Sequence, residues 1–67
     1  MKPDWKDAPK WANWLFWCKF SDSWVWCSQR PRWSILFLKY EPKGAWVYAR
    51  FPINWAGNGR DSLEPRP

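Results

Sequence analysis

Histidine is absent from this 67-residue chain, which also has only two cysteines, three glycines and one methionine. Without histidine the chain lacks the side chain that most often acts as an acid–base catalyst near neutral pH. Two cysteines cannot supply the four ligands of a structural zinc site. The six carboxylates are scattered along the chain, and no glycine-rich phosphate-binding loop is present. We therefore expect no enzymatic activity, no metal site and no cofactor.

Long apolar runs are also missing. The longest are Trp14–Cys18 and Ile35–Leu38, which are far too short to cross a bilayer. The first residues lack the apolar stretch of a secretory signal. We expect a cytoplasmic protein with reduced thiols and no membrane partner.

Aromatic residues are abundant instead, with nine Trp, four Phe and two Tyr. A chain of this size is near the lower limit for independent folding and cannot bury all its large side chains. Several tryptophans should therefore be partly exposed, and exposed aromatics are typical of binding surfaces.

Positive charge is in excess, with a formal net charge of +5. Between Lys10 and Arg50, seven basic residues stand against two acidic ones, while the charges of the two ends cancel. A charge of this size serves solubility, but it also favours an acidic partner, either a nucleic acid or an acidic protein surface.

The aromatic and turn-forming residues predict a single small domain. We expect an N-terminal arm at 1–10, a β-meander at 11–51 and a C-terminal arm at 52–67, in which Ile53 and Trp55 pack on the sheet. The meander is centred on a hairpin that turns at Ser21-Asp22-Ser23, three small polar residues that favour turns. The predicted fold class is all-β: a small antiparallel meander of three to four strands with irregular arms.

Four strands are predicted within this meander, at 11–20, 24–28, 33–40 and 45–51. The first also has helical spacing of its apolar residues, but the preceding proline and the high aromatic content favour a strand. Pro31 is expected to end the second strand, because proline cannot donate to a β-ladder. The third, apolar on both faces, is expected to be central, and Glu41-Pro42-Lys43-Gly44 matches a type I turn.

The hairpin register decides how the two cysteines relate. With a three-residue turn, Cys18 faces Trp26 and the two thiols lie on opposite faces of the sheet. With a two-residue turn, Cys18 faces Cys27, and only this register would permit a disulfide. We expect two buried free thiols.

Short motifs near both ends and in the hairpin carry a resemblance to a protein family. The motifs are Asp4-Trp5, Ala8-Pro9-x-Trp11-Ala12, Trp24-Val25-Trp26, Pro31, Trp46, Asn54-Trp55 and Asp61-Ser62-Leu63-Glu64-x-Arg66-Pro67. With this spacing the chain resembles small tryptophan-rich proteins encoded in phage and prophage accessory regions. The resemblance implies a protein made inside a bacterial host cell, where such proteins often bind and inhibit a host or defence protein.

The leading functional hypothesis is therefore a small binding protein that modulates such a partner through an aromatic and basic sheet face. Aromatic residues and arginine most often carry interface energy. The residues expected to form this face are Trp24, Trp26, Trp46, Tyr48, Arg30, Arg32 and Arg50. The alternatives are a single-stranded nucleic-acid-binding protein that uses the same face, and self-association, for example as a homodimer.

Overall fold

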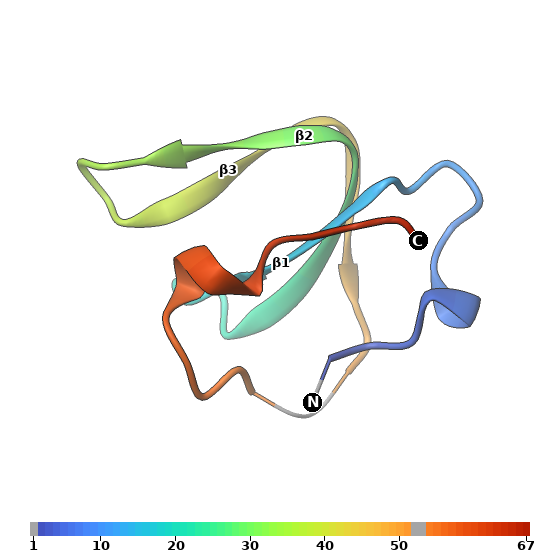
Figure 1. Cartoon of the computed structure of the whole chain (residues 1–67), viewed down its shortest axis with the longest axis horizontal. Helices are drawn as coiled ribbons and strands as arrows, with labels where there is room; N and C mark the ends of the chain where they lie inside the picture. Colours follow the sequence, from blue (N-terminus) through green and yellow to red (C-terminus); the bar gives the residue numbers. More distant parts are fainter. Residues whose placement is uncertain (1, 52–53) are drawn as a thin grey trace.

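The chain folds into one antiparallel sheet, as the aromatic pattern predicted. The computed structural model describes residues 2–51 and 54–67. In this part of the chain the strands are β1 (Trp14–Cys18), β2 (Ser23–Ser34), β3 (Lys39–Ala49) and β4 (Glu64–Pro65). Their order across the sheet is β3-β2-β1-β4, so the first three strands form a meander and β4 returns to pair with β1 (Figure 1). The strand reading of the first apolar segment is correct, and the helical alternative is not.

The register of the β1–β2 hairpin differs from both predicted registers. Trp14 is opposite Cys27, and Cys18 is opposite Ser23. The turn therefore has four residues, 19–22, and ends at Asp22 with a φ of 48°. Aspartate tolerates this left-handed conformation better than most residues.

This register places the two thiols on the same face of the sheet but at opposite ends of the hairpin. Cys18 lies beside the turn, whereas Cys27 lies where β1 begins. Both cysteines are buried and free, which confirms the prediction of two free thiols.

Pro31 does not end the second strand, contrary to prediction. Between the pairs Gln29–Lys43 and Arg32–Glu41, β2 holds one more residue than β3, which is a β-bulge. Residues in a bulge leave the regular ladder, so a proline is tolerated there. β2 consequently runs on to Ser34.

The predicted type I turn at 41–44 is also wrong, because these residues lie inside β3. Between the Cys27–Trp46 pair and the next pair towards the tip, β3 holds one extra residue. Gly44, with a φ of 69°, supplies the left-handed backbone that such a bulge commonly uses. The reversal occurs instead at 35–38, within the segment predicted to be a central strand.

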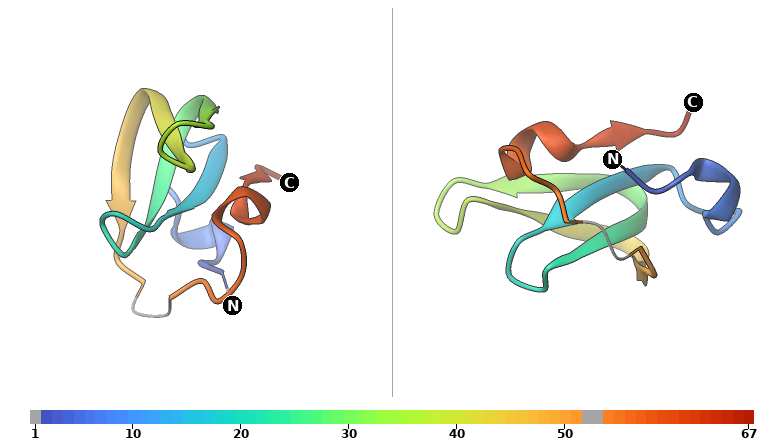
Figure 2. Two further views of the ribbon diagram at one scale, coloured as in Figure 1. Left: turned by 90° about the vertical axis from the view of Figure 1, so that its left-hand side faces the viewer. Right: turned by 90° about the horizontal axis from the view of Figure 1, so that it is seen from below.

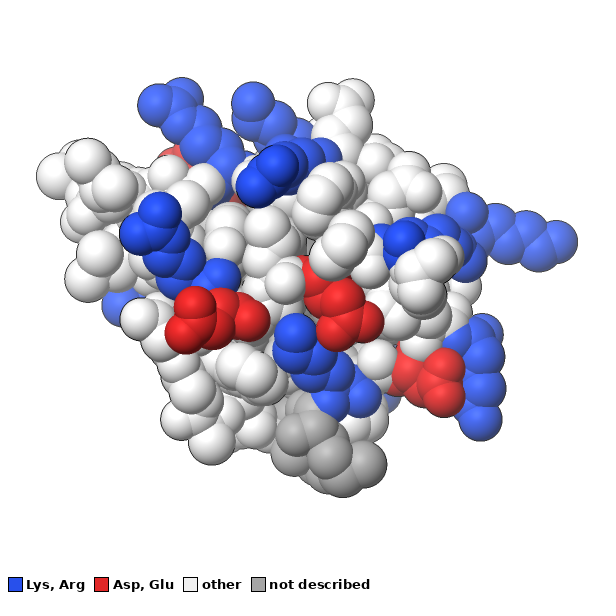
Figure 3. Space-filling view, viewed as in Figure 1, with Lys and Arg blue, Asp and Glu red and all other residues white. Residues whose placement is uncertain are grey.

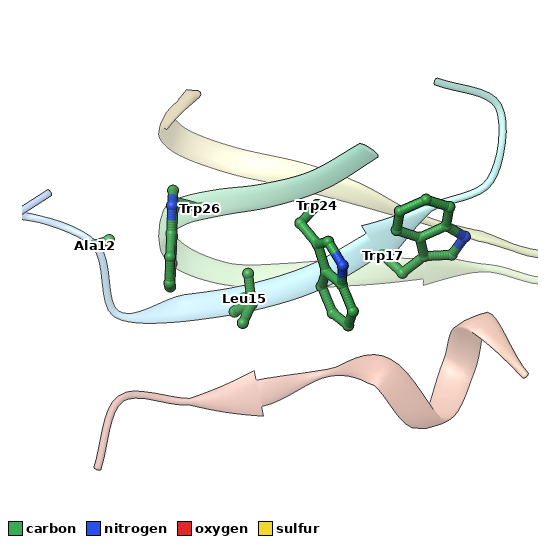
Figure 4. Close-up of a cluster of buried hydrophobic side chains, with 5 residues drawn as sticks. All are labelled: Ala12, Leu15, Trp17, Trp24 and Trp26. Carbon is green, nitrogen blue, oxygen red and sulfur yellow. The ribbon is translucent and has the colours of Figure 1, made fainter. Parts of the chain in front are cut away.

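Alternate residues of β1 and β2 build one apolar cluster on each face of the sheet. Trp24 and Trp26 point to one face, and Val25 and Cys27 to the other, as predicted. The first cluster (Figure 4) consists of Ala12, Leu15, Trp17, Trp24 and Trp26. The second consists of Phe16, Cys18, Val25, Cys27 and Tyr40.

Segments from the two arms cover these clusters. Trp5 packs on Trp26 at 4.8 Å between ring centroids, and Trp55 packs on Trp24 at 5.7 Å. The packing predicted for Trp55 is therefore confirmed, whereas Ile53 lies outside the described residues. Leu63 lies against the second cluster.

Irregular arms flank the sheet, as predicted, and each contains one short 3-10 helix. The N-terminal helix, η1, is Trp5–Asp7 and is capped by Asp4. The C-terminal helix, η2, is Gly59–Ser62 and is capped by Asn58. Figure 2 shows the C-terminal arm running beside the outer edge of β1. No helix in the described ranges is long and apolar enough to span a membrane.

The terminal motifs bind the two arms to each other. Trp5 Nε1 donates a hydrogen bond to Glu64 Oε1 at 2.6 Å, and Lys2 forms an ion pair with the same carboxylate at 3.3 Å. The Arg66 guanidinium donates to the carbonyls of Pro9 and Ala12. The motifs at both ends of the chain thus have a structural role.

The buried Ser62 fixes the C-terminal arm to the sheet. Its hydroxyl accepts a hydrogen bond from the Trp17 backbone amide at 2.9 Å and donates to the Gly59 carbonyl at 2.6 Å. A buried amide left without an acceptor costs about 1–3 kcal/mol. The Ser62 hydroxyl therefore provides the acceptor for the Trp17 amide, which lies beyond the part of β1 that pairs with β4.

Candidate functional site

The seven residues predicted to form one binding face do not lie together. Trp24 and Trp26 are core residues, with 0% and 3% of their surface exposed. They are buried because both arms pack over the face of the sheet to which these two side chains point. Trp24 is therefore closed off from a partner, and Trp26 reaches the surface only in the wall of a hollow.

Trp46 and Tyr48 are exposed, but on the opposite face of the sheet. In the strand register Trp46 is opposite Cys27 and Tyr48 is opposite Val25, so both share the face of the second cluster. Their rings form an edge-to-face pair with centroids 5.2 Å apart. The Tyr48 hydroxyl lies 3.2 Å from that of Ser21 in the β1–β2 turn.

The three predicted arginines are exposed, with Arg30 and Arg32 on β2 and Arg50 beyond the end of β3. The Arg30 guanidinium stacks over Trp14 at 5.4 Å from the ring centroid. Arg32 lies nearer the tip of the β2–β3 hairpin, opposite Glu41. Arg50 follows the end of β3 and lines a hollow of about 300 Å³ together with Trp26.

Four consecutive exposed apolar residues lie where the sequence predicted a central strand. The β2–β3 turn consists of Ile35, Leu36, Phe37 and Leu38, whose side chains are 54–83% exposed. Phe20, in the β1–β2 turn, is also exposed, and it lines one hollow with Phe37. We call these five residues the apolar tip. Soluble proteins rarely expose such a group of large apolar side chains without a binding role.

The backbone of the apolar tip is unfavourable for one of its residues. Leu38 has a φ of 54°, in the left-handed region that non-glycine residues other than Asn and Asp seldom occupy. Asp22 occupies the equivalent last position of the β1–β2 turn with a similar φ. Because Leu38 is exposed, burial does not offset this backbone cost. Backbone strain of this kind is concentrated at functional sites.

Cationic side chains surround the apolar tip. The Lys19 and Lys39 ammonium groups lie 5.4 and 5.2 Å from the centroid of the Phe20 ring. Arg32 lines a hollow of about 330 Å³ with Leu36 and Glu41. Figure 3 shows uncharged surface at the left end of the molecule, over the tip of the β2–β3 hairpin, with lysine and arginine side chains near it. The tip therefore combines exposed apolar area with a rim of three cations, Lys19, Lys39 and Arg32, and one carboxylate, Glu41.

The ionisable side chains of the core do not form a reactive centre. Burial raises the pKa of the Cys27 thiol, although a hydrogen bond with the backbone of Lys43 partly opposes the shift. A raised pKa lowers the fraction of nucleophilic thiolate. Burial likewise raises the pKa of the Tyr40 hydroxyl, which donates a 2.6 Å hydrogen bond to the Arg60 carbonyl. Within the described ranges no group of three or more potential metal ligands occurs.

Sequence reasoning missed the apolar tip because 35–38 contains no residue that favours turns. Four consecutive large apolar residues are typical of a buried strand. The informative signal lay on either side, where Gln29–Ser34 and Lys39–Lys43 are polar enough to form a solvated two-stranded ribbon. Pro31 and Gly44 concealed this ribbon, since both resemble strand or turn boundaries.

Comparison of the chain with protein-family models, with curated proteins and with solved structures gives no match. The resemblance to small phage proteins accordingly stays a prediction, and the function has to be argued from the apolar tip.

Proposed function

We propose that this protein is a small binding protein that modulates a host or defence protein, as proteins of the phage type do, and that it docks through the apolar tip. The observation that carries the proposal is the exposure of Ile35 and Leu36, 83% and 81%, at the end of a two-stranded ribbon. Such a projection fits an apolar groove, and the cationic rim favours a groove bordered by acidic residues.

The energetics of the tip support a role in binding. Burying one Leu, Ile or Phe side chain gains roughly 1.5–3 kcal/mol. The tip exposes Ile35, Leu36, Phe37 and Leu38 on one turn, so the free protein forgoes this gain at four adjacent positions. A preformed hairpin also loses little conformational entropy when it binds, which raises its affinity.

Affinity capture from nuclease-treated bacterial lysate tests the proposal. The wild-type protein should retain one dominant protein, and Leu36→Ser should lose it, because the substitution removes apolar area at an exposed position without disturbing the core. Tyr48→Ala is the control, since Tyr48 is also an exposed large side chain, at 51%, but lies on the sheet face away from the tip. Equal capture by Leu36→Ser and the wild type would contradict the proposal. So would a wild type that captures no protein and binds only phosphatidylglycerol vesicles in a Leu36-dependent way.

Single-stranded nucleic acid is the second candidate partner. The Lys19 and Lys39 ammonium groups both lie close to the Phe20 ring, at 5.4 and 5.2 Å from its centroid. An aromatic ring with cations beside it suits the stacking of a base and the binding of its phosphates. In this case Phe20→Ala should weaken the binding of a labelled oligonucleotide, and affinity should fall steeply with salt. A protein complex of the apolar tip should instead weaken little between low and physiological ionic strength.

A further inference from the structure

The outer edge of β3 is the open side of the sheet. β3 is the terminal strand in the order β3-β2-β1-β4, and no described strand pairs with its outer side. Figure 2 shows β3 along one margin of the molecule, on the far side of β2 from the C-terminal arm. An unpaired edge presents backbone amide and carbonyl groups that can pair with another strand.

The segment 45–49 at this edge lacks the features that normally prevent such pairing. Its sequence, Ala-Trp-Val-Tyr-Ala, contains neither a charge nor a proline. Trp46, Val47 and Tyr48 are all exposed. The opposite edge differs, because β4 has only two residues, one of them Pro65. Of these two outer strands of the described sheet, β3 is therefore the one suited to accept a further strand.

The same segment is self-complementary about Val47. In an antiparallel pair of two such strands centred there, Val47 is opposite Val47, Trp46 is opposite Tyr48, and Ala45 is opposite Ala49. Beyond them Gly44 is opposite Arg50, so like charges do not face each other. Aromatic pairs directly across an antiparallel ladder are stabilising, and like-charge pairs are destabilising.

We propose that the protein forms a homodimer by antiparallel pairing of β3 with β3 of a second copy, centred on Val47. The occupant of the edge is a second copy because the segment matches its own reverse in size and charge. Trp46 and Tyr48 already contact each other within one subunit, with ring centroids 5.2 Å apart. Pairing places this ring pair directly beside its counterpart in the second copy, so a two-by-two group of aromatic rings spans the dimer seam. The apolar tip lies at the other end of the β2–β3 hairpin and remains free.

Light scattering coupled to gel filtration tests this proposal through charge swaps at Val47. The wild type should show twice the 8.2 kDa mass of the chain at high concentration. Val47→Lys alone and Val47→Glu alone should each be monomeric, since the pairing sets two like charges opposite each other. An equimolar mixture of the two variants should restore the dimer. Leu36→Lys, a charge added at the exposed tip, should leave the dimer unchanged.

Oxidative cross-linking of Val47→Cys provides a second measurement that does not depend on a destabilising charge. The two introduced thiols are opposite each other in the proposed register, so a covalent dimer should form rapidly, and Leu36→Cys should form it slowly. A wild type that remains monomeric up to millimolar concentration would overturn the proposal. So would a dimer that survives Val47→Lys, or one that Leu36→Lys abolishes. These outcomes are independent of partner capture by the apolar tip.

Discussion

At the scale of single residues, the structure departs from local preference at Leu38 and conforms to it at Asp22. Both residues end four-residue turns with left-handed backbone. Aspartate and asparagine tolerate this conformation because their short side chains hydrogen-bond locally, whereas leucine has no such compensation. Leucine at position 38 thus lowers the stability of the folded state, which is consistent with its retention for binding.

This interpretation predicts that Leu38→Asn stabilises the protein. Relief of the left-handed strain should raise the free energy of unfolding by about 0.5–1 kcal/mol, because the exposed leucine loses little packing. Urea denaturation followed by tryptophan fluorescence measures the change. A clear loss of stability would show that Leu38 packs in the folded state and would remove the argument from strain.

Two buried hydroxyl and thiol groups predict how stability depends on pH. Burial raises the pKa of both Cys27 and Tyr40 in the folded state. Above about pH 9, near the usual thiol pKa, the unfolded chain releases these protons while the folded chain retains them. Deprotonation then favours the unfolded state, so stability should be full at pH 7 and should fall as the pH rises towards 11.

Urea denaturation under reducing conditions at several alkaline pH values measures this dependence. The variant Cys27→Ala, although less stable, should show a weaker decline with pH than the wild type. A free energy of unfolding that stays constant or increases between pH 8 and 11 would show that Cys27 and Tyr40 do not control stability at alkaline pH.

At the scale of elements, the bulges of the β2–β3 ribbon determine how the ribbon bends away from the sheet. Gly44 combines a φ of 69° with close contact, since a Cβ atom built on it would lie 2.2 Å from Ser28 Oγ. That hydroxyl accepts a hydrogen bond from the Ala45 amide at 3.0 Å, so it cannot move without loss of the bond. Gly44 is therefore required for the bend that carries the ribbon away from the sheet.

Replacement of this glycine should cost stability. Gly44→Ala is expected to lower the free energy of unfolding by roughly 1–3 kcal/mol, from the left-handed backbone and the clash together. Gly59→Ala is the matched control, because a Cβ atom there meets nothing within 4 Å. Thermal and chemical denaturation of both variants compare the two positions. Equal effects at Gly44 and Gly59 would mean that the bulge does not depend on glycine.

The sequence allowed prediction of the fold class and of which β2 residues share a face, because period-two alternation in Trp24–Cys27 is a local property. Registers were not predictable in the same way. The β1–β2 turn begins at Lys19 and Phe20, which carry no turn signal, so its length could not be read locally. Pro31 and Gly44 were read as boundaries, since a bulge becomes evident only when both paired strands are known.

The candidate site was less predictable than the fold for the same reason. Exposure depends on which face the arms cover, and this is a long-range property that involves Trp5, Trp55 and Leu63. The aromatic character of Trp46 and Tyr48 was a correct guide to exposure, whereas that of Trp24 and Trp26 was not. The apolar tip was missed because 35–38, the β2–β3 turn within it, has the composition of a core strand.

At the scale of the whole molecule, the residues that stabilise the fold are separate from those proposed to bind partners. The two arms and the β1–β2 hairpin bury the core, and Arg66, Glu64 and Ser62 hold the arms in place. The β2–β3 ribbon extends from this body with the apolar tip at its end and the open β3 edge nearer its base (Figure 1). Under the two proposals, one small chain uses one surface for a partner and another for a second copy.

Site-directed photo-cross-linking in bacteria tests the central claim, that the apolar tip contacts a partner protein, most directly. A benzophenone side chain in place of Phe37 should yield one dominant cross-linked host protein, and the same group in place of the exposed Trp11 should not. The group in place of Tyr48 should cross-link mainly to a second copy of the chain, which mass spectrometry distinguishes. Cross-links to a host protein from Tyr48 and none from Phe37 would contradict the account and would assign binding to the sheet face.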